Sequence, residues 1–116
     1  MYQLHKIMNI DFDNTELYVI PNFKGGEKAV RVRMFDDGAN KIMKMSLVPG
    51  ASVGMHVHED SSEIVFILSG CGSVVFDGEK SGISAGDCHY CPKGHSHSIV
   101  NDSDSDLEFF AVVPKQ

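Results

Sequence analysis

Residues 50–70 read GASVGMHVHEDSSEIVFILSG and place two histidines and a glutamate among small and apolar residues. Side chains alternate between the two faces of an extended strand, so His56 and His58 are expected to point the same way. Glu63 follows five residues after His58, across a short polar turn at 59–62, and can converge with them on one point. Imidazole nitrogens and a carboxylate oxygen are suitable ligands for a divalent metal ion. For this stretch taken alone, a pair of strand histidines without a metal is the alternative.

A second stretch, residues 86–101, reads GDCHYCPKGHSHSIVN. Pro92 and Gly94 form a turn signal just before His95 and His97. His97 lies on an expected strand, HSHSIV, and can supply a third imidazole. If that strand is regular, His95 shares the face of His97.

The spacing within the two stretches resembles the two motifs of the cupin superfamily at every position. Glycine, the commonest letter involved, has an average usage of about 7%, so this many fixed letters do not match by accident. The resemblance covers residues 50–101 by motif and roughly 29–113 by strand pattern, and it does not extend to residues 1–28. The matching letters are Gly50, His56, His58, Glu63 and Gly70, then Gly86, Pro92, Gly94, His97 and Asn101.

The resemblance implies a small single-domain cupin of the conserved-barrel type, with an all-β fold. This fold is the cupin double-stranded β-helix, a jelly-roll barrel of two antiparallel sheets with a metal ion inside its open mouth. We expect the barrel over residues 29–116, after a partly irregular segment at 1–28 that could exchange a strand within a homodimer. The implied cofactor is a divalent transition metal: Mn, Fe, Ni, Co or Zn. The implied metal ligands are His56, His58, Glu63 and His97.

The strand pattern supports an all-β fold independently. Segments 28–35 and 40–48 alternate in polarity on either side of the hairpin signal Asp37-Gly38. Short strands separated by turn residues are typical of a sandwich or barrel, although the pattern alone does not choose between jelly-roll and immunoglobulin-like topology. Helical periodicity is absent over any long window. Further strands are expected at 15–20, 53–58, 63–69, 72–77, 79–84 and 107–113, and across HSHSIV.

Composition narrows the class of protein. The chain has 116 residues, which indicates one domain, and its net charge of −6 argues against nucleic-acid and anionic membrane partners. No apolar run has the length needed to span a bilayer. The N-terminus lacks the features of a signal peptide, and the three cysteines cannot all pair, which fits a cytoplasmic protein.

Several other residues are candidates for chemistry. Cys88 and Cys91 have the spacing of a redox or zinc pair, but cysteines three apart on a strand face opposite ways, which favours packing. His95 could shuttle protons or act as an extra ligand; its alternative role is a polar residue lining the mouth. Tyr90 is a second candidate catalytic residue, although such aromatics are more often core. Arg31 and Arg33 could anchor a carboxylate if their face lines the cavity.

We expect a divalent-metal-dependent enzyme that acts on a small chelating metabolite, such as an acid, an enol or a sugar-like compound. Dioxygenase, isomerase and lyase chemistry all fit cupins with this ligand set, so the reaction rests on analogy. Thiol dioxygenases are disfavoured, because that branch replaces the motif's glutamate and this chain keeps Glu63. The alternative is a non-catalytic module that binds or senses a metal-chelated small molecule. A homodimer is expected from the resemblance and from the need to cover sheet edges.

Overall fold

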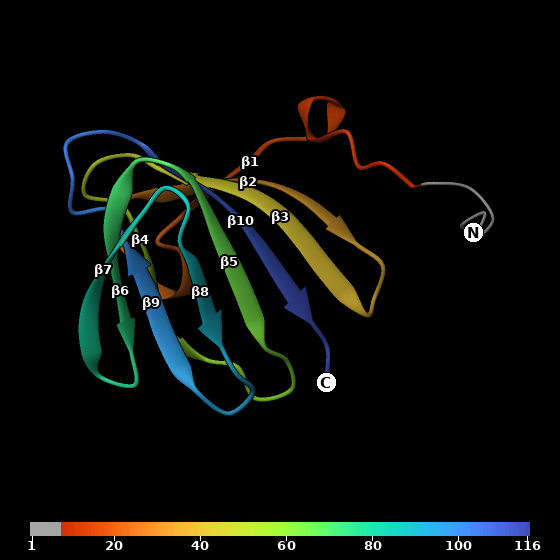
Figure 1. Cartoon of the computed structure of the whole chain (residues 1–116). Coiled ribbons are helices and arrows are strands. Elements are labelled where there is room, and N and C mark those ends of the chain that lie inside the picture. Colours follow the sequence, from red (N-terminus) through yellow and green to blue (C-terminus); the bar gives the residue numbers. More distant parts are fainter. Residues whose placement is uncertain (1–7) are drawn as a thin grey trace.

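The computed structural model describes residues 8–116, which form two antiparallel sheets with almost no helix (Figure 1). One sheet has the strand order β1-β2-β3-β10-β5-β8 and the other has the order β4-β9-β6-β7. This is the expected jelly-roll barrel. The elements are η1 (Phe12–Asn14), β1 (Tyr18–Pro21), η2 (Phe23–Gly25), β2 (Ala29–Asp36), β3 (Asn40–Leu47), β4 (Ser52–Val57), β5 (Glu63–Ser69), β6 (Cys71–Phe76), β7 (Glu79–Ser84), β8 (Cys88–Cys91), β9 (Ser96–Val100) and β10 (Leu107–Pro114).

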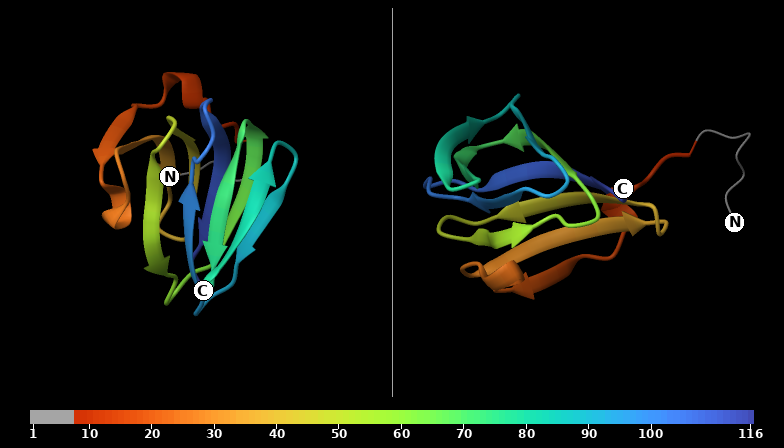
Figure 2. Two further views of the ribbon diagram at one scale, coloured as in Figure 1. Left: turned by 90° about the vertical axis from the view of Figure 1, so that its left-hand side faces the viewer. Right: turned by 90° about the horizontal axis from the view of Figure 1, so that it is seen from below.

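The hydrophobic core lies between the two sheets, whose strands curve around a common interior (Figure 2). Alternation along β2 decides its orientation: Val30 and Val32 are 0% and 3% exposed, whereas Arg31 lies on the opposite face. Strands β3 and β10 follow the same rule, and Phe109 of β10 is fully buried. The polarity pattern of the sequence therefore chooses the inner face of the six-stranded sheet.

The expected strands agree with the observed ones to within a few residues. The segments 28–35 and 40–48 correspond to Ala29–Asp36 and Asn40–Leu47. Strand β8, Cys88–Cys91, was assumed from the sequence only in weighing its two cysteines and was not placed among the expected strands, because its four residues are too few to show a pattern.

Four glycines of the two sequence motifs occupy turns that need a left-handed backbone. Their φ angles are all positive, and a residue with a Cβ would be strained there. At one of them, Gly70, an added Cβ would also lie 2.3 Å from the carbonyl oxygen of Asp106. The positions of these glycines in the two motifs therefore mark turns between strands of the barrel. The four φ values are 84° at Gly50, 84° at Gly70, 95° at Gly86 and 87° at Gly94.

The segment before β2 joins the barrel. Strand β1 pairs with β2 at the edge of the six-stranded sheet, and η2 packs on β4. The contact is tight, since a Cβ on Gly54 would lie 2.0 Å from the carbonyl oxygen of Lys24. Exchange of a strand within a homodimer stays a prediction, and residues 1–7 of that segment lie outside the described part of the chain. Among the described residues no helix is long and apolar enough to cross a membrane.

Asn101, the last letter of the second motif, is fully buried and organises the loop after β9. Its side-chain amide donates to the carbonyl oxygens of Leu47 and Ser105, at 2.8 Å each. Its side-chain oxygen accepts from the backbone N–H of Ser103 at 3.1 Å and from the hydroxyl of Ser103 at 2.7 Å. The residue therefore ties β3 to the loop at 101–106.

The variant Asn101→Ala should lower the free energy of unfolding by about 2–4 kcal/mol, because buried polar groups lose their partners. Urea unfolding of the metal-free protein measures this change. Asp104→Ala, at an exposed position in the same loop, is the matched control and should change stability by less than about 0.5 kcal/mol. Equal effects of the two substitutions would contradict the assigned role.

Candidate metal centre

A β-bulge in β4 brings two histidines to the interior of the barrel. Val53 pairs with Ile99 and His56 pairs with His97, so three steps along β4 match two steps along β9. The extra residue changes the alternation between Val53 and His56. Val53, His56 and His58 consequently all line the space between the sheets.

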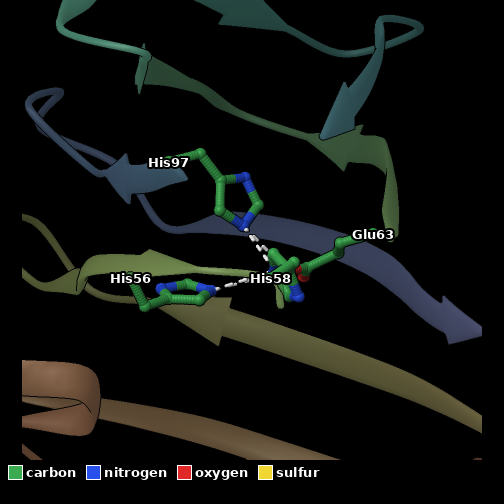
Figure 3. A group of neighbouring side chains, drawn as sticks. All are labelled: His56, His58, Glu63 and His97. Carbon is green, nitrogen blue, oxygen red and sulfur yellow. Dashed lines mark hydrogen bonds and ion pairs between the residues drawn. The ribbon is translucent and has the colours of Figure 1, made fainter. Parts of the chain in front are cut away.

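The other two members of the cluster come from different strands (Figure 3). Glu63 is the first residue of β5, and His97 is the second residue of β9. The ligand atoms of the four residues lie within 4.8 Å of one another. His58 Nε2 is 2.9 Å from Glu63 Oε1, 3.0 Å from His97 Nε2 and 3.1 Å from His56 Nε2. His97 Nε2 is also 2.9 Å from Glu63 Oε1.

These distances suit a metal ion. Neighbouring donors held at right angles, about 2.1 Å from one ion, lie about 3.0 Å apart. His56 Nδ1 is 2.7 Å from the carbonyl oxygen of Gly54. Because a carbonyl oxygen only accepts hydrogen bonds, Nδ1 carries the ring proton, and Nε2 of the neutral ring has a free lone pair. Lone pairs and a carboxylate this close repel one another unless a positive charge lies between them. The cluster could therefore hold a metal ion, and mixed nitrogen and oxygen donors do not select one metal.

Each imidazole of the cluster also has a partner on its outer nitrogen. His58 Nδ1 lies 3.1 Å from the hydroxyl of Ser61, and His97 Nδ1 lies 2.9 Å from Nε2 of His89. The rings of His89 and His97 are stacked, with centroids 5.2 Å apart. Burial, together with the nearby His97, lowers the pKa of His89.

His89 is a site residue that was missed from the sequence. Its signal was available, because His89 is two residues from Cys91 in CHYC and therefore shares its face once a strand is recognised there. Cys91 is fully buried, so that face is the inner one.

Glu63 is almost fully buried, at 6% exposed. Burial opposes ionisation of its carboxyl group, but when Nε2 atoms of the imidazoles of His56, His58 and His97 carry protons in place of a cation, their hydrogen bonds outweigh that cost and hold its pKa well below the usual range. The cluster thus presents a carboxylate and not a neutral acid.

The two candidate catalytic residues lie apart from the four donors. His95 precedes β9; its Nδ1 is 2.5 Å from Oδ2 of Asp77 and its ring stacks on Phe76. Tyr90 is 53% exposed and lies on the face of β8 opposite Cys91. A catalytic role for either residue stays a prediction.

Arg31 and Arg33 are on the outer face of β2, since Val32 between them lines the cavity. Arg33 donates to the carbonyl oxygen of Thr15 at 2.5 Å. An arginine anchor for a ligand within the cavity is therefore not available from this pair.

A cavity of about 360 Å³ opens beside the donors His56, His58 and Glu63. Its inner wall is apolar, and its rim carries charged side chains of both signs. The apolar wall residues are Ile20, Phe23, Val32, Met34, Met43, Met45, Val53, Val57, Ile99, Phe109 and Val113. The charged rim residues are Lys24, Lys41, Glu59 and Asp60.

The chain is similar to known proteins over most of its length. A family model described as Cupin domain matches residues 43–113. A Thermotoga maritima protein named oxalate-binding protein is 39% identical over 100 residues, which cover 81% of this chain and 83% of that protein. The crystal structure of a predicted oxalate decarboxylase from Thermotoga maritima has a TM-score of 0.88 and 35% identity, covering 94% of this chain and 100% of that one. The polyketide cyclase RemF from Streptomyces resistomycificus has a TM-score of 0.78 at 19% identity, covering 96% and 81%, which concerns the fold alone.

The cysteines of CHYC face opposite ways, as the spacing predicts. Cys88 is exposed and Cys91 is buried, and both are free thiols. Burial raises the pKa of the Cys91 thiol to about 11, with smaller contributions from the carboxylates of Glu63 and Asp77. This arrangement separates the pair and gives Cys91 little thiolate at neutral pH.

Cys91 should resist alkylation of the folded protein by iodoacetamide at pH 8, while the exposed Cys71 and Cys88 are labelled. Raising a thiol pKa from 9.0 to about 11 lowers its thiolate fraction about a hundredfold at that pH, before burial slows access further. Peptide mass spectrometry after timed labelling measures the three rates. Labelling of Cys91 as fast as that of Cys88 would refute the assignment, and unfolding in urea should equalise the rates.

Proposed function

This chain belongs to the cupin family, and we propose that His56, His58, Glu63 and His97 hold a divalent transition-metal ion that binds a small chelating acid. One observation carries the proposal: three imidazole nitrogens and a carboxylate oxygen converge in the barrel, with four of their spacings close to 3 Å and His56 Nε2 3.8 Å from Glu63 Oε1. Such a donor set needs a positive charge at its centre. Manganese, iron, cobalt, nickel and zinc all suit mixed nitrogen and oxygen donors.

When bound, the ion supplies a Lewis acid that polarises the oxygen atoms of a chelating ligand. The residues of the chain set the conditions for that binding. Glu63 stays ionised and cancels one of the two positive charges, which leaves an excess that attracts an anion. The apolar wall gives a low-dielectric surrounding, which strengthens each electrostatic interaction.

Oxalate is the first ligand to consider. The relative from Thermotoga maritima that is 39% identical to this chain is named for oxalate binding. Oxalate is a dianion with two carboxylates able to chelate one ion, which matches the charge and donor set inferred above.

Of the two candidate functions, we prefer a metal-dependent enzyme of dioxygenase, isomerase or lyase type. Protonatable groups outside the donor set, Lys41, Glu59 and Asp60, lie at the rim of the same cavity and are candidates for proton exchange with a bound acid. A binding module without turnover is the second candidate, favoured by the name of that relative. Incubation of the metal-loaded protein with oxalate, followed by NMR, separates the two: consumption indicates the enzyme and retention indicates the module.

We also propose a homodimer. The outer face of the six-stranded sheet exposes Phe66, Leu68 and Tyr90, which are 49%, 41% and 53% exposed. Clustered apolar side chains on a sheet face are typical of a protein interface. Strands β1 and β8 form the edges of this sheet, and edges favour a covering partner.

The variant Glu63→Gln tests the metal centre. It keeps the size of the side chain but removes the negative charge, so the affinity for zinc should fall at least tenfold, and oxalate binding at a zinc concentration that half-saturates the unchanged chain should fall with it. Elemental analysis of the purified protein and calorimetric titration measure the two quantities. Glu79→Gln, the same change at an exposed position of β7, should leave both unchanged. Zinc binding of unaltered strength in Glu63→Gln, or no binding of any of the five metals by the unchanged chain, would end the proposal.

A further inference from the structure

We infer that the natural ligand of this site carries an apolar body behind its chelating head, as in a 2-oxo or 2-hydroxy acid with a hydrocarbon chain. The inference rests on the proposed function and specifies its ligand class. It comes from the size and the wall chemistry of the cavity, not from the donor set.

The cavity is much larger than a chelating head requires. At about 30 Å³ for each water molecule of the liquid, 360 Å³ corresponds to roughly twelve waters. Oxalate has only six non-hydrogen atoms. A ligand limited to a chelating head would leave about half of the cavity to water.

The wall next to the donors gives such water little to bind. The cavity is lined by the partly buried Ile20, Phe23, Met34 and Val113, and by Val53, Met43 and Met45, which are 3%, 8% and 4% exposed. Apart from the cluster and Ser61, which is engaged with His58, the polar side chains that line the cavity lie at the exposed rim. Water against apolar walls makes few hydrogen bonds, so an apolar ligand body displaces it favourably.

The charges at the rim do not select a second anionic group. Lys24 and Lys41 face the solvent, and the acidic Glu59 and Asp60 line the same opening. The two signs offset each other. Methionines in the wall have flexible side chains, which allows the cavity to close on hydrocarbon bodies of different shape. The single anionic head therefore belongs at the metal and the apolar body along the methionines.

Calorimetric titration of the zinc-loaded protein with straight-chain 2-oxo acids, from pyruvate to 2-oxooctanoate, tests this inference. Zinc is redox-inert, so binding is measured without turnover of oxygen. Each methylene buried against the wall should tighten binding about fourfold until the cavity is full. Equal affinities along the series would overturn the inference.

Met43→Phe and Met55→Phe form a matched pair for the same titration. Met43 lines the cavity, whereas Met55 is 50% exposed on β4. Met43→Phe fills the cavity, so the ratio of the affinity for 2-oxooctanoate to that for pyruvate should fall at least tenfold while oxalate binding persists. Met55→Phe should leave this ratio unchanged. The chain-length series on the unchanged protein decides the matter even if Met43→Phe does not fold. Oxalate binding with a flat series would leave the proposed function standing and refute this inference, whereas no binding of oxalate or of any 2-oxo acid would refute both.

A separate observation assigns a role to His89, and we propose that it is the positioning residue of His97. For Nε2 of His97 to face the other donors as a lone pair, its Nδ1 must carry the ring proton and donate it in a hydrogen bond. The acceptor at 2.9 Å is Nε2 of His89. His97 is fully buried and its outer nitrogen faces this imidazole.

His89→Leu and His89→Gln separate positioning from packing. Leucine cannot accept the hydrogen bond, whereas the side-chain carbonyl of glutamine can. Zinc affinity, measured by competition with a chromophoric chelator, should fall tenfold to a hundredfold in His89→Leu and be largely recovered in His89→Gln. The Nδ1–H resonance of His97 in ¹H–¹⁵N spectra should follow the same order. Equal zinc affinities of the two variants, or a His97 resonance that does not respond, would overturn the assignment.

Discussion

The structure depends on burying four mutually repelling donor atoms at one point between two sheets. Removing imidazole nitrogens and a carboxylate from water is costly unless a positive charge compensates them. His56 and His97 face each other on the paired strands β4 and β9 of one sheet, and Glu63 is the first residue of β5 in the other sheet. The cluster therefore links the two sheets, and whatever cation it holds acts on the packing of the barrel as well as on its ligands.

The wall of the site is the core of the protein. Val32, Met45 and Phe109 belong to the hydrophobic core and also line the cavity beside the donors. Residues that exclude water from the core therefore also strengthen the field around the donors. Because these side chains serve both purposes, a substitution that changes the shape of the ligand space also changes the packing of the fold.

Much of this architecture could be predicted from the sequence, because motif spacing and strand alternation are local. The resemblance to the cupin motifs identified the four clustered residues, and alternation put Val32 and Arg31 on opposite faces of one strand without showing which face is the inner one. Alternation could not show the bulge in β4, since an extra residue leaves no mark in the pattern and appears only in the pairing with β9. His89 was missed because its strand is four residues long. The ring of His95 lies against Asp77 and Phe76, a pair of contacts made with another strand and turn that the sequence did not reveal.

The bulge has two effects that join the N-terminal segment to the site. It turns His56 inward, and the carbonyl of Gly54 within it accepts the outer ring proton of the same histidine. Gly54 cannot carry a side chain, because the backbone of Lys24 lies where a Cβ would be. Residues 20–24 also supply part of the cavity wall. Residues 20–24 lie outside both sequence motifs, yet they pack on β4, the strand that orients His56, and they close the space in which the body of the bound molecule would lie. The motifs therefore supply the metal-binding chemistry, whereas a different part of the chain contributes to the choice of the bound molecule.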